Sequence, residues 1–475
     1  MKKVSKISSI IFYLFSQILS QVPFLEIRPY APPSFEQYPV SHSVDHHFPY
    51  TNQADDVFLR FDGKEFTENL LYPNCLSGSS CYDGHAGVDY YMPFDNPILA
   101  PADGYVLWSS FSPAADPCPG GITPNGDQGT IIVVHGNGYY TVYLHLNEPL
   151  NVSVGDNVVV GDTLGFNGNT GCAINAHLHF EIRKDNWFFD SNEPYVVDPF
   201  GWWGDSTDPI ETIRDNRSEW LWVSNSLVDD GDNGFQRFSG PDWTYLNVGF
   251  NNDSWIAPAT QNILDSRHYA LWVPYIEQSS EHNIEIYIPP GLDASTEAIY
   301  ELNIKHENGI SSTTNIIVNQ NTEPGFFHTI ETITLPSGYN CSIILRDAVG
   351  SSSTGSNVVF DAIRFSPVTS YIKEENNKKN LFSNQIDIVS VFPNPFNSST
   401  KIKYDIKKQG DVSVVILDMS GNLIDKHHNK NQPIGEYYFE WDGKTNTGRN
   451  LPTGIYFFSV SLNGEKATGK LINLK

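Results

Sequence analysis

The sequence predicts a mainly β protein with several domains. The chain is 475 residues long, it carries 36 Gly and 30 Pro with 13% aromatic residues, and apolar and polar residues alternate over many short stretches. A chain of this length is too long to fold around one hydrophobic core, and alternation of apolar and polar residues with a period of two is typical of strands. We therefore expect two to four domains built from short strands rather than long helices.

The first segment has the pattern of a secretory signal peptide. Residues 1–20 carry three lysines among the first six positions, then an apolar run over residues 10–19. That order predicts export and cleavage after Ser20. An uncleaved membrane anchor is the alternative, but the apolar run is short for a span. We expect a secreted or cell-surface protein with no stable membrane insertion after signal removal.

Net charge and cysteine content restrict the functions and the cellular compartment that the protein can have. The formal net charge of −26 disfavours binding to nucleic acid or anionic membranes, since both need clustered Lys and Arg. Five cysteines fit an oxidising compartment better than a thiol enzyme. Four of them permit three pairings, of which we expect Cys75 with Cys81 and Cys118 with Cys172. Cys341 is expected to be a buried free thiol.

Changes in composition divide the mature chain. Residues 206–222 read as an acidic, partly helical connector. The other predicted parts are a leader segment (21–55), a strand-rich domain (56–205), a β-sandwich (223–368), a flexible linker (369–385) and a small separate sandwich (386–475).

Two histidines alternate on one predicted strand of the strand-rich domain. In His177-Leu-His179-Phe, side chains repeat every two residues, so both imidazoles face one side and apolar residues face the other. Such a pair is a rigid platform for a cation. Two surface histidines on a half-exposed strand are the alternative.

An earlier strand carries a third histidine. Over residues 139–146, alternation places His145 on a polar face with Thr141 and Tyr143, and the residues between them on the core face. Taken alone, His145 reads as structural.

A histidine and a carboxylate precede these strands. His85 and Asp89 stand four apart, and the flanking Gly84 and Gly87 favour a loop that runs into a strand. Two histidines and one carboxylate suit zinc and leave the fourth tetrahedral position open for water. The spacing is a weak signal alone and a stronger one beside the other two motifs.

Together these motifs resemble the lysostaphin-type zinc endopeptidases, which cut peptidoglycan cross-links. The resemblance rests on His85-x-x-x-Asp89 and His177-x-His179. It extends to the Ala-Pro-Ala-Asp-Gly turn within residues 90–108, to the strand ending in His145, and to the Gly-Asp turns of residues 154–165, and it covers residues 80–185.

The resemblance implies a set of roles. His85, Asp89 and His179 become the ligands of one Zn²⁺ per chain, and His145 and His177 become catalytic residues that orient water, stabilise the oxyanion and protonate the leaving amine. Zinc lowers the pKa of water from 15.7 to about 7. The substrate would be peptidoglycan or another peptide. A protease of Gly-rich proteins and a non-catalytic cell-wall-binding surface protein are the alternatives.

The remaining histidine pairs are expected to be solvated, His46-His47 in the leader and His427-His428 in a charged turn. A preceding segment occupies the groove and inhibits the enzyme in some members of the resembled family. By analogy, a second interpretation of the leader is that His42, Asp45, His46 or His47 caps the zinc.

The two later regions also carry resemblances. Residues 223–368 are similar to the sandwich domain of golvesin-like secreted enzymes, where Trp243, Trp255 and Trp272 would be core residues or, alternatively, platforms for sugar rings. Residues 386–475, with Phe392-Pro-Asn-Pro-Phe-Asn and Trp441-Asp-Gly, are similar to C-terminal sorting domains of the type IX secretion system. That machinery is the implied partner, and a plain immunoglobulin-like spacer is the alternative.

Overall fold

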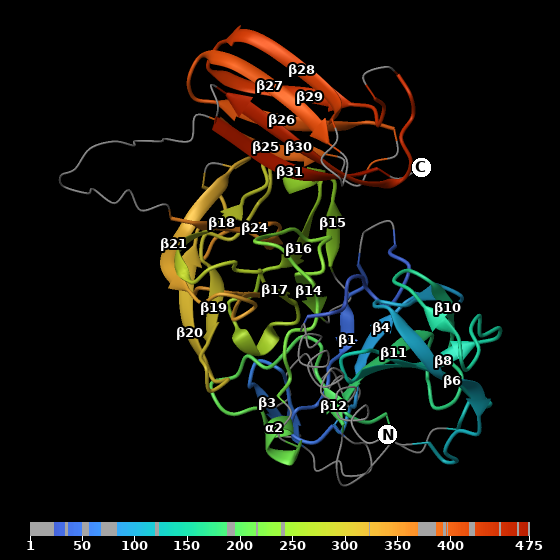
Figure 1. Cartoon of the computed structure of the whole chain (residues 1–475). Coiled ribbons are helices and arrows are strands. Elements are labelled where there is room, and N and C mark those ends of the chain that lie inside the picture. Colours follow the sequence, from blue (N-terminus) through green and yellow to red (C-terminus); the bar gives the residue numbers. More distant parts are fainter. Residues whose placement is uncertain are drawn as a thin grey trace, which may run out of the picture. The chain divides into compact units, whose positions relative to one another are not determined.

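Short strands dominate the protein, which confirms the predicted fold class (Figure 1). The predicted signal segment, the 369–385 linker and the Cys75–Cys81 pair lie outside the residues that the structure describes. The described part divides into two compact units, Met1–Ser370 and Tyr371–Lys475. None of its helices is long and apolar enough to cross a membrane. The computed structural model describes residues 23–33, 37–49, 57–67, 83–118, 123–187, 195–214, 217–238, 243–322, 324–368, 386–392, 396, 398–417, 423–445, 448–462 and 465–473.

The first half of the first unit contains the leader and the predicted peptidase. Strand β1 (Val40–His42) belongs to the leader, and β2 (Val57–Leu59) and β3 (Glu65–Thr67) follow it at the start of the predicted strand-rich domain. The connector forms the short helix α2 (Pro209–Arg214), as the sequence predicts. The strands between them are β4 (Val88–Tyr91), β5 (Pro97–Leu99), β6 (Gly104–Ser112), β7 (Gln128–Val134), β8 (Tyr139–Asn147), β9 (Asn157–Val158), β10 (Thr163–Asn167), β11 (His177–Lys184) and β12 (Val196–Val197).

The second half of this unit is the predicted sandwich region. Its 3₁₀ turns are η4 (Phe250–Asn252) and η5 (Ile263–Asp265). Its strands are β13 (Leu227–Val228), β14 (Phe235–Phe238), β15 (Thr244–Leu246), β16 (Ser254–Pro258), β17 (Tyr269–Trp272), β18 (Ser280–Tyr287), β19 (Ala298–Lys305), β20 (Ser311–Val318), β21 (Phe327–Leu335), β22 (Cys341–Val349), β23 (Asn357–Phe360) and β24 (Ile363–Pro367).

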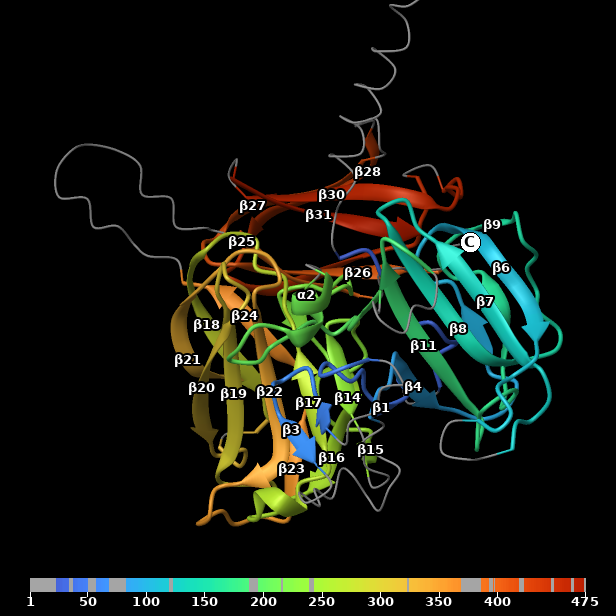
Figure 2. The same ribbon diagram turned by 90° about the horizontal axis from the view of Figure 1, so that it is seen from below.

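Leader strand β1 joins the two halves into one sheet. It pairs in parallel with β14 and antiparallel with β4, where His42 lies opposite Asp89. The path of this 15-stranded sheet is β20-β19-β22-β17-β14-β1-β4-β11-β8-β7-β6-β9 (Figures 1 and 2). The leader is therefore an integral strand, because removing it would leave two edges unpaired.

One hydrophobic cluster spans the sheet on both sides of β1. It includes Val40 of the leader, Tyr90 of β4, Leu178 and Phe180 of β11, and Trp222 at the end of the connector, all at most 1% exposed. Burial of each large apolar side chain stabilises the fold by about 1.5–3 kcal/mol. The cluster holds β11 by its apolar face, which leaves the histidine face of the strand free for a site.

The sandwich region has its own core. Trp255 and Trp272 are 5% and 0% exposed, and Trp243 packs against the same cluster. Trp272 stacks on Phe360 with ring centroids 6.3 Å apart. These contacts confirm the core interpretation for Trp255 and Trp272, whereas Trp243 is only partly buried against the same core.

The second unit is a sandwich of two antiparallel sheets around one core, ordered β25-β26-β29 and β28-β27-β30-β31. His427 and His428 are exposed, as expected, but they lie on strand β28 rather than in a turn. The strands are β25 (Ile386–Phe392), β26 (Thr400–Ile406), β27 (Gly410–Leu417), β28 (Leu423–Gln432), β29 (Gly435–Trp441), β30 (Gly454–Leu462) and β31 (Glu465–Asn473).

The cysteines that the structure describes behave as predicted. Cys118 and Cys172 form a disulfide with a sequence separation of 54 residues. This bond ties the segment after β6 to the loop before β11. Cys341 is a buried free thiol on β22, and burial raises the pKa of that thiol.

Candidate metal centre

Two glycines shape the loop that presents His85 and Asp89. Gly84 has a φ of 78°, a left-handed conformation that glycine adopts without strain. A Cβ at Gly87 would lie 2.7 Å from Phe180 O and 2.8 Å from His179 Nε2. The chain can therefore approach β11 closely only without a side chain at this position. The result is the predicted geometry, with His85 in a loop and Asp89 on the strand that follows.

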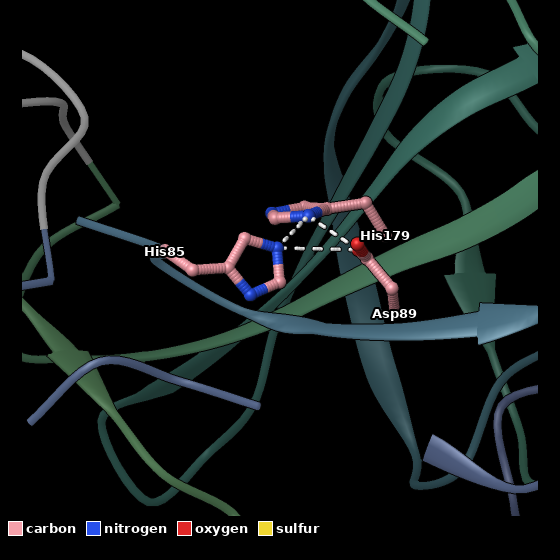
Figure 3. Close-up of side chains that lie close together, drawn as sticks. All are labelled: His85, Asp89 and His179. Carbon is pink, nitrogen blue, oxygen red and sulfur yellow. Dashed lines mark hydrogen bonds and ion pairs between the residues drawn. The ribbon is translucent and has the colours of Figure 1, made fainter. Parts of the chain in front are cut away.

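Three side chains from the loop, β4 and β11 meet at one point. His179 Nδ1 lies 2.9 Å from Asp89 Oδ1 and 3.1 Å from His85 Nε2, and the third distance, from His85 Nε2 to Asp89 Oδ1, is 3.3 Å. Figure 3 shows these side chains directed at one another. Ligands of a tetrahedral zinc ion with bonds of 2.0–2.1 Å lie about 3.3–3.4 Å apart. The triangle fits one such ion with little movement.

Hydrogen bonds behind the triangle fix the tautomers of both imidazoles. His85 Nδ1 lies 2.9 Å from the carbonyl oxygen of Ser43, which can only accept, so this nitrogen donates. His179 Nε2 donates to Glu181 Oε1 over 3.1 Å, and Arg183 pairs with Glu181 in turn. In both rings the lone pair is left on the nitrogen that faces Asp89, as metal ligation requires.

The charges of the triangle depend on burial and on mutual contacts. Burial lowers the pKa of His85, despite the nearby carboxylate. Burial would raise the pKa of Asp89, but the charges of His85 and His177 hold it well below its usual value. Burial would lower the pKa of His179, but hydrogen bonds to Asp89 and Glu181 raise it to about 9. The pocket therefore favours a positive charge beside an ionised carboxylate, a charge that a bound divalent cation would supply.

His145 reaches the site through an irregularity in β8. The alternation prediction for this strand is wrong, because Tyr143 packs into the main core and Leu144 lies opposite His179. His145 has a φ of 65°, and the pairing register of β7 and β8 shifts next to it. Such a bulge redirects a side chain to the other face of the sheet. The side chain of His145 therefore lies on the same face as the metal site, and not on the face of Tyr143 as strict alternation predicts.

His145 and His177 lie side by side next to the triangle. Their ring centroids are 4.7 Å apart, and His177 Nε2 is 3.8 Å from Asp89 Oδ1. Each Nδ1 donates to a backbone carbonyl, over 2.7 Å to Thr170 and over 2.8 Å to Asn175. Burial, with the charges of the neighbouring histidines, lowers the pKa of His145 to about 3. All five predicted site residues are therefore in one place.

The leader contacts the site through His42 and Asp45, which the sequence analysis named only as possible caps of the zinc. His42 Nδ1 lies 3.2 Å from Asp89 Oδ2, the carboxylate oxygen turned away from the imidazoles. The Asp45 carboxylate accepts a hydrogen bond of 2.8 Å from the backbone N–H of Gly84. Together with the Ser43 carbonyl, these groups hold the loop and the carboxylate in place. Only the long-range pairing of β1 with β4 reveals them.

The prediction for His46 is wrong. This side chain is fully buried between Asp198 and Asp208, at 3.1 and 2.9 Å. Burial alone would lower the pKa of His46, but the carboxylate of Asp208 and that of Asp198 raise it to about 10. A doubly paired imidazolium replaces the solvated histidine expected from the His-His pattern, and both of its ring nitrogens contact carboxylates outside the metal triangle.

Comparison with known proteins identifies the site-bearing region. Residues 83–191 match the family model "Peptidase family M23", and residues 395–466 match "FlgD Ig-like domain". A peptidoglycan DD-endopeptidase of Vibrio cholerae is 35% identical over 98 residues, which are 21% of this chain and 20% of that protein. A glycyl-glycine endopeptidase of Staphylococcus capitis is 32% identical over 130 residues, 27% of this chain and 31% of that protein.

The chain spans less than a third of the length of these curated relatives. An uncharacterised metalloprotease of Buchnera aphidicola is 37% identical over 133 residues, and the chain covers 31% of its length. Among solved structures, the catalytic domain of lysostaphin from Staphylococcus simulans aligns at 27% identity over 26% of this chain and 81% of that chain, with a TM-score of 0.20. The sequence matches support an M23 peptidase domain, of the metallopeptidase type, within residues 83–191.

Proposed function

We propose that this protein is an exported zinc metalloendopeptidase that hydrolyses peptide bonds in peptidoglycan cross-bridges. The observation that carries the proposal is the triangle of His85, Asp89 and His179, whose three facing atoms lie 2.9–3.3 Å apart. The donor set of two imidazoles and one carboxylate is that of a catalytic zinc site with an open fourth position. The M23 match over residues 83–191 supports the metallopeptidase class.

Zinc held by these residues supplies Lewis acidity, which lowers the pKa of water from 15.7 to about 7 and polarises the scissile carbonyl. The carboxylate of Asp89 offsets part of the positive charge. Glu181 holds the ring of His179 in the ligating tautomer. The chain contributes no His-Glu-x-x-His glutamate, so proton transfer falls to the adjacent imidazoles.

His145 and His177 are the proposed proton carriers. Because each Nδ1 donates to a backbone carbonyl, each neutral ring keeps its lone pair on Nε2. That nitrogen accepts a proton from the attacking water, and after protonation its N–H stabilises the oxyanion or protonates the departing amine. The ring of His177 lies nearer to Asp89, with its Nε2 3.8 Å from the carboxylate.

Peptidoglycan is the proposed substrate because the similar proteins include DD-endopeptidases and a DD-carboxypeptidase/endopeptidase of Neisseria meningitidis. Because a glycyl-glycine endopeptidase is among the similar proteins, the second candidate function is proteolysis of Gly-rich proteins. A non-catalytic wall-binding protein is the third.

Mass spectrometry of fragments released from purified sacculi separates these candidates. The zinc-loaded full chain should release peptides with new termini at cross-bridges, and His85→Ala should release none. Release from a glycine-rich polypeptide but not from sacculi would favour the second candidate. Sedimentation of intact chain with sacculi without any released fragment would favour the third.

Export and sorting complete the proposal. The order of charged and apolar residues in 1–20 supports signal-directed export, and the motifs of 386–475 support recognition by type IX secretion machinery. Truncation after residue 370, where the first compact unit ends, tests the second point. The truncated chain should stay in the periplasm of a type IX-competent host, whereas the full chain reaches the surface or medium.

A further inference from the structure

We propose that Asp229, Asp230 and Asp253 form a binding site for a hard divalent cation of the calcium class. The site belongs to the sandwich region and is separate from the histidine cluster. One carboxylate oxygen from each residue lies within 4.8 Å of the others. The inference does not depend on the proposed peptidase function.

Two loops that are distant in sequence build the site. Asp229 and Asp230 follow β13 directly, and Asp253 stands between η4 and β16. The Asn251 side-chain amide donates to Asp229 Oδ2 over 2.6 Å, which holds the loops together. A cation between the loops would connect them as a staple at one end of the sandwich.

The three carboxylates are withdrawn from water. Asp229, Asp230 and Asp253 are 8%, 1% and 6% exposed. Asp253 Oδ1 is buried without a hydrogen-bond partner among the described residues. Burying an anionic oxygen without a donor or a counter-charge is costly, and the residues that the structure describes supply neither to this atom. The arrangement therefore points to a bound cation.

Two other buried carboxylates of the same unit have cationic partners. Asp62 pairs with Arg60 at 2.9 Å, and Asp347 pairs with His268 at 2.8 Å. Among the residues that the structure describes, no such ion pair involves Asp229 or Asp253. Within the described part of the chain, Asp229 and Asp253 therefore lack the counter-charge that Asp62 and Asp347 have.

The electrostatics of a neighbouring carboxyl agree with this picture. Burial raises the pKa of Asp229 to about 7, and the charge of Asp253 adds to that effect. Asp361, whose carboxylate accepts hydrogen bonds from the N–H groups of Phe250 and Ala362, has its pKa raised to about 9 by burial and by both of those charges. Both shifts reflect negative charge gathered at a buried place, which a divalent cation bound at the cluster would offset.

The donor set selects the cation. All the candidate side-chain ligands are oxygens, which suit calcium, magnesium or manganese rather than zinc. Calcium accepts irregular sets of six to eight oxygens, whereas magnesium requires a near-octahedral arrangement and dehydrates reluctantly. Extracellular calcium modules bind with Kd values of about 10⁻⁴–10⁻³ M, which is the range expected here.

Titration of the full chain tests the proposal. The protein is freed of metal, supplied with one equivalent of zinc, and titrated with calcium chloride by calorimetry. We expect one calcium site per chain, and Asp253→Asn should weaken it by about tenfold or more, since affinity follows the charge count of the ligands. Glu281→Gln, which removes an exposed carboxylate from β18 of the same sandwich, is the matched control and should bind as wild type does.

Terbium luminescence excited through tryptophan gives a second measurement on unmutated protein, so the test stands even if Asp253→Asn fails to fold. Emission should appear with wild type, fall on addition of calcium, and persist in His85→Ala. Absence of calcium binding by folded wild type would overturn the proposal. Equal binding by Asp253→Asn and wild type would overturn it as well.

Discussion

Replacement of His42 by alanine should weaken zinc binding although His42 is not a proposed ligand. His42 Nδ1 lies 3.2 Å from Asp89 Oδ2, and their side chains are 12% and 10% exposed. A hydrogen bond to a charged group is worth about 1.5–3 kcal/mol. Loss of an outer partner of a ligand typically costs about 10- to 100-fold in metal affinity, or about 1.4–2.7 kcal/mol. The two estimates agree, so we expect a loss in that range.

Competition with a chromophoric zinc chelator measures this loss on the full chain. His428→Ala, an exposed histidine of the second unit, is the matched control and should leave zinc affinity unchanged. His42→Gln keeps a donor and should recover part of the affinity. If His42→Ala bound zinc as tightly as wild type, the orientation of Asp89 would not depend on the leader, and our reading of β1 would be refuted.

Four further outcomes follow from the structure. His145→Ala should lower kcat by about 10²–10⁴-fold while zinc content stays at one per chain, and a proportional loss of zinc would instead mark His145 as a ligand. Removal of the Cys118–Cys172 disulfide, with its separation of 54 residues, should lower the free energy of unfolding by about 4 kcal/mol in denaturant titrations. Because the pKa of His46 is raised to about 10, the stability that its charged form gives the fold should be complete below pH 6.5 and should vanish as the pH rises through 10. Urea unfolding of wild type and His46→Gln across that pH range measures this contribution. A difference in unfolding free energy that does not change with pH would contradict the prediction. Deletion of residues 21–55 should abolish soluble folded protein, since β1 pairs on both edges, and a folded, more active product would support an inhibitory leader instead.

Local pattern was sufficient to predict much of the candidate site. Loop glycines and strand periodicity place His85, Asp89, His177 and His179 correctly, because these features depend on neighbours in sequence. His145 was grouped with the right residues for the wrong reason. Strict alternation places His145 on the same face of β8 as Tyr143, but the bulge turns its side chain to the opposite face. The sequence of one strand does not reliably show where a bulge occurs.

The pairing of strands that are distant in the chain could not be predicted from the sequence. The contact of His42 with Asp89 depends on β1 lying between β4 and β14, strands from regions that composition alone separates. The burial of His46 depends on Asp198 and Asp208, more than 150 residues away in sequence, at 152 and 162 positions. Adjacent polar residues in a sequence are normally expected to be exposed to solvent. They are buried only where the folded chain brings a polar or charged partner to them.

The most direct test is anomalous scattering at the zinc edge from crystals of the zinc-loaded full chain. The account predicts one strong peak per chain, about 2.0–2.2 Å from His85 Nε2, an Asp89 carboxylate oxygen and His179 Nδ1, and no peak there for Asp89→Ala. A zinc peak at another place in the chain, or an unchanged peak in Asp89→Ala, would contradict it.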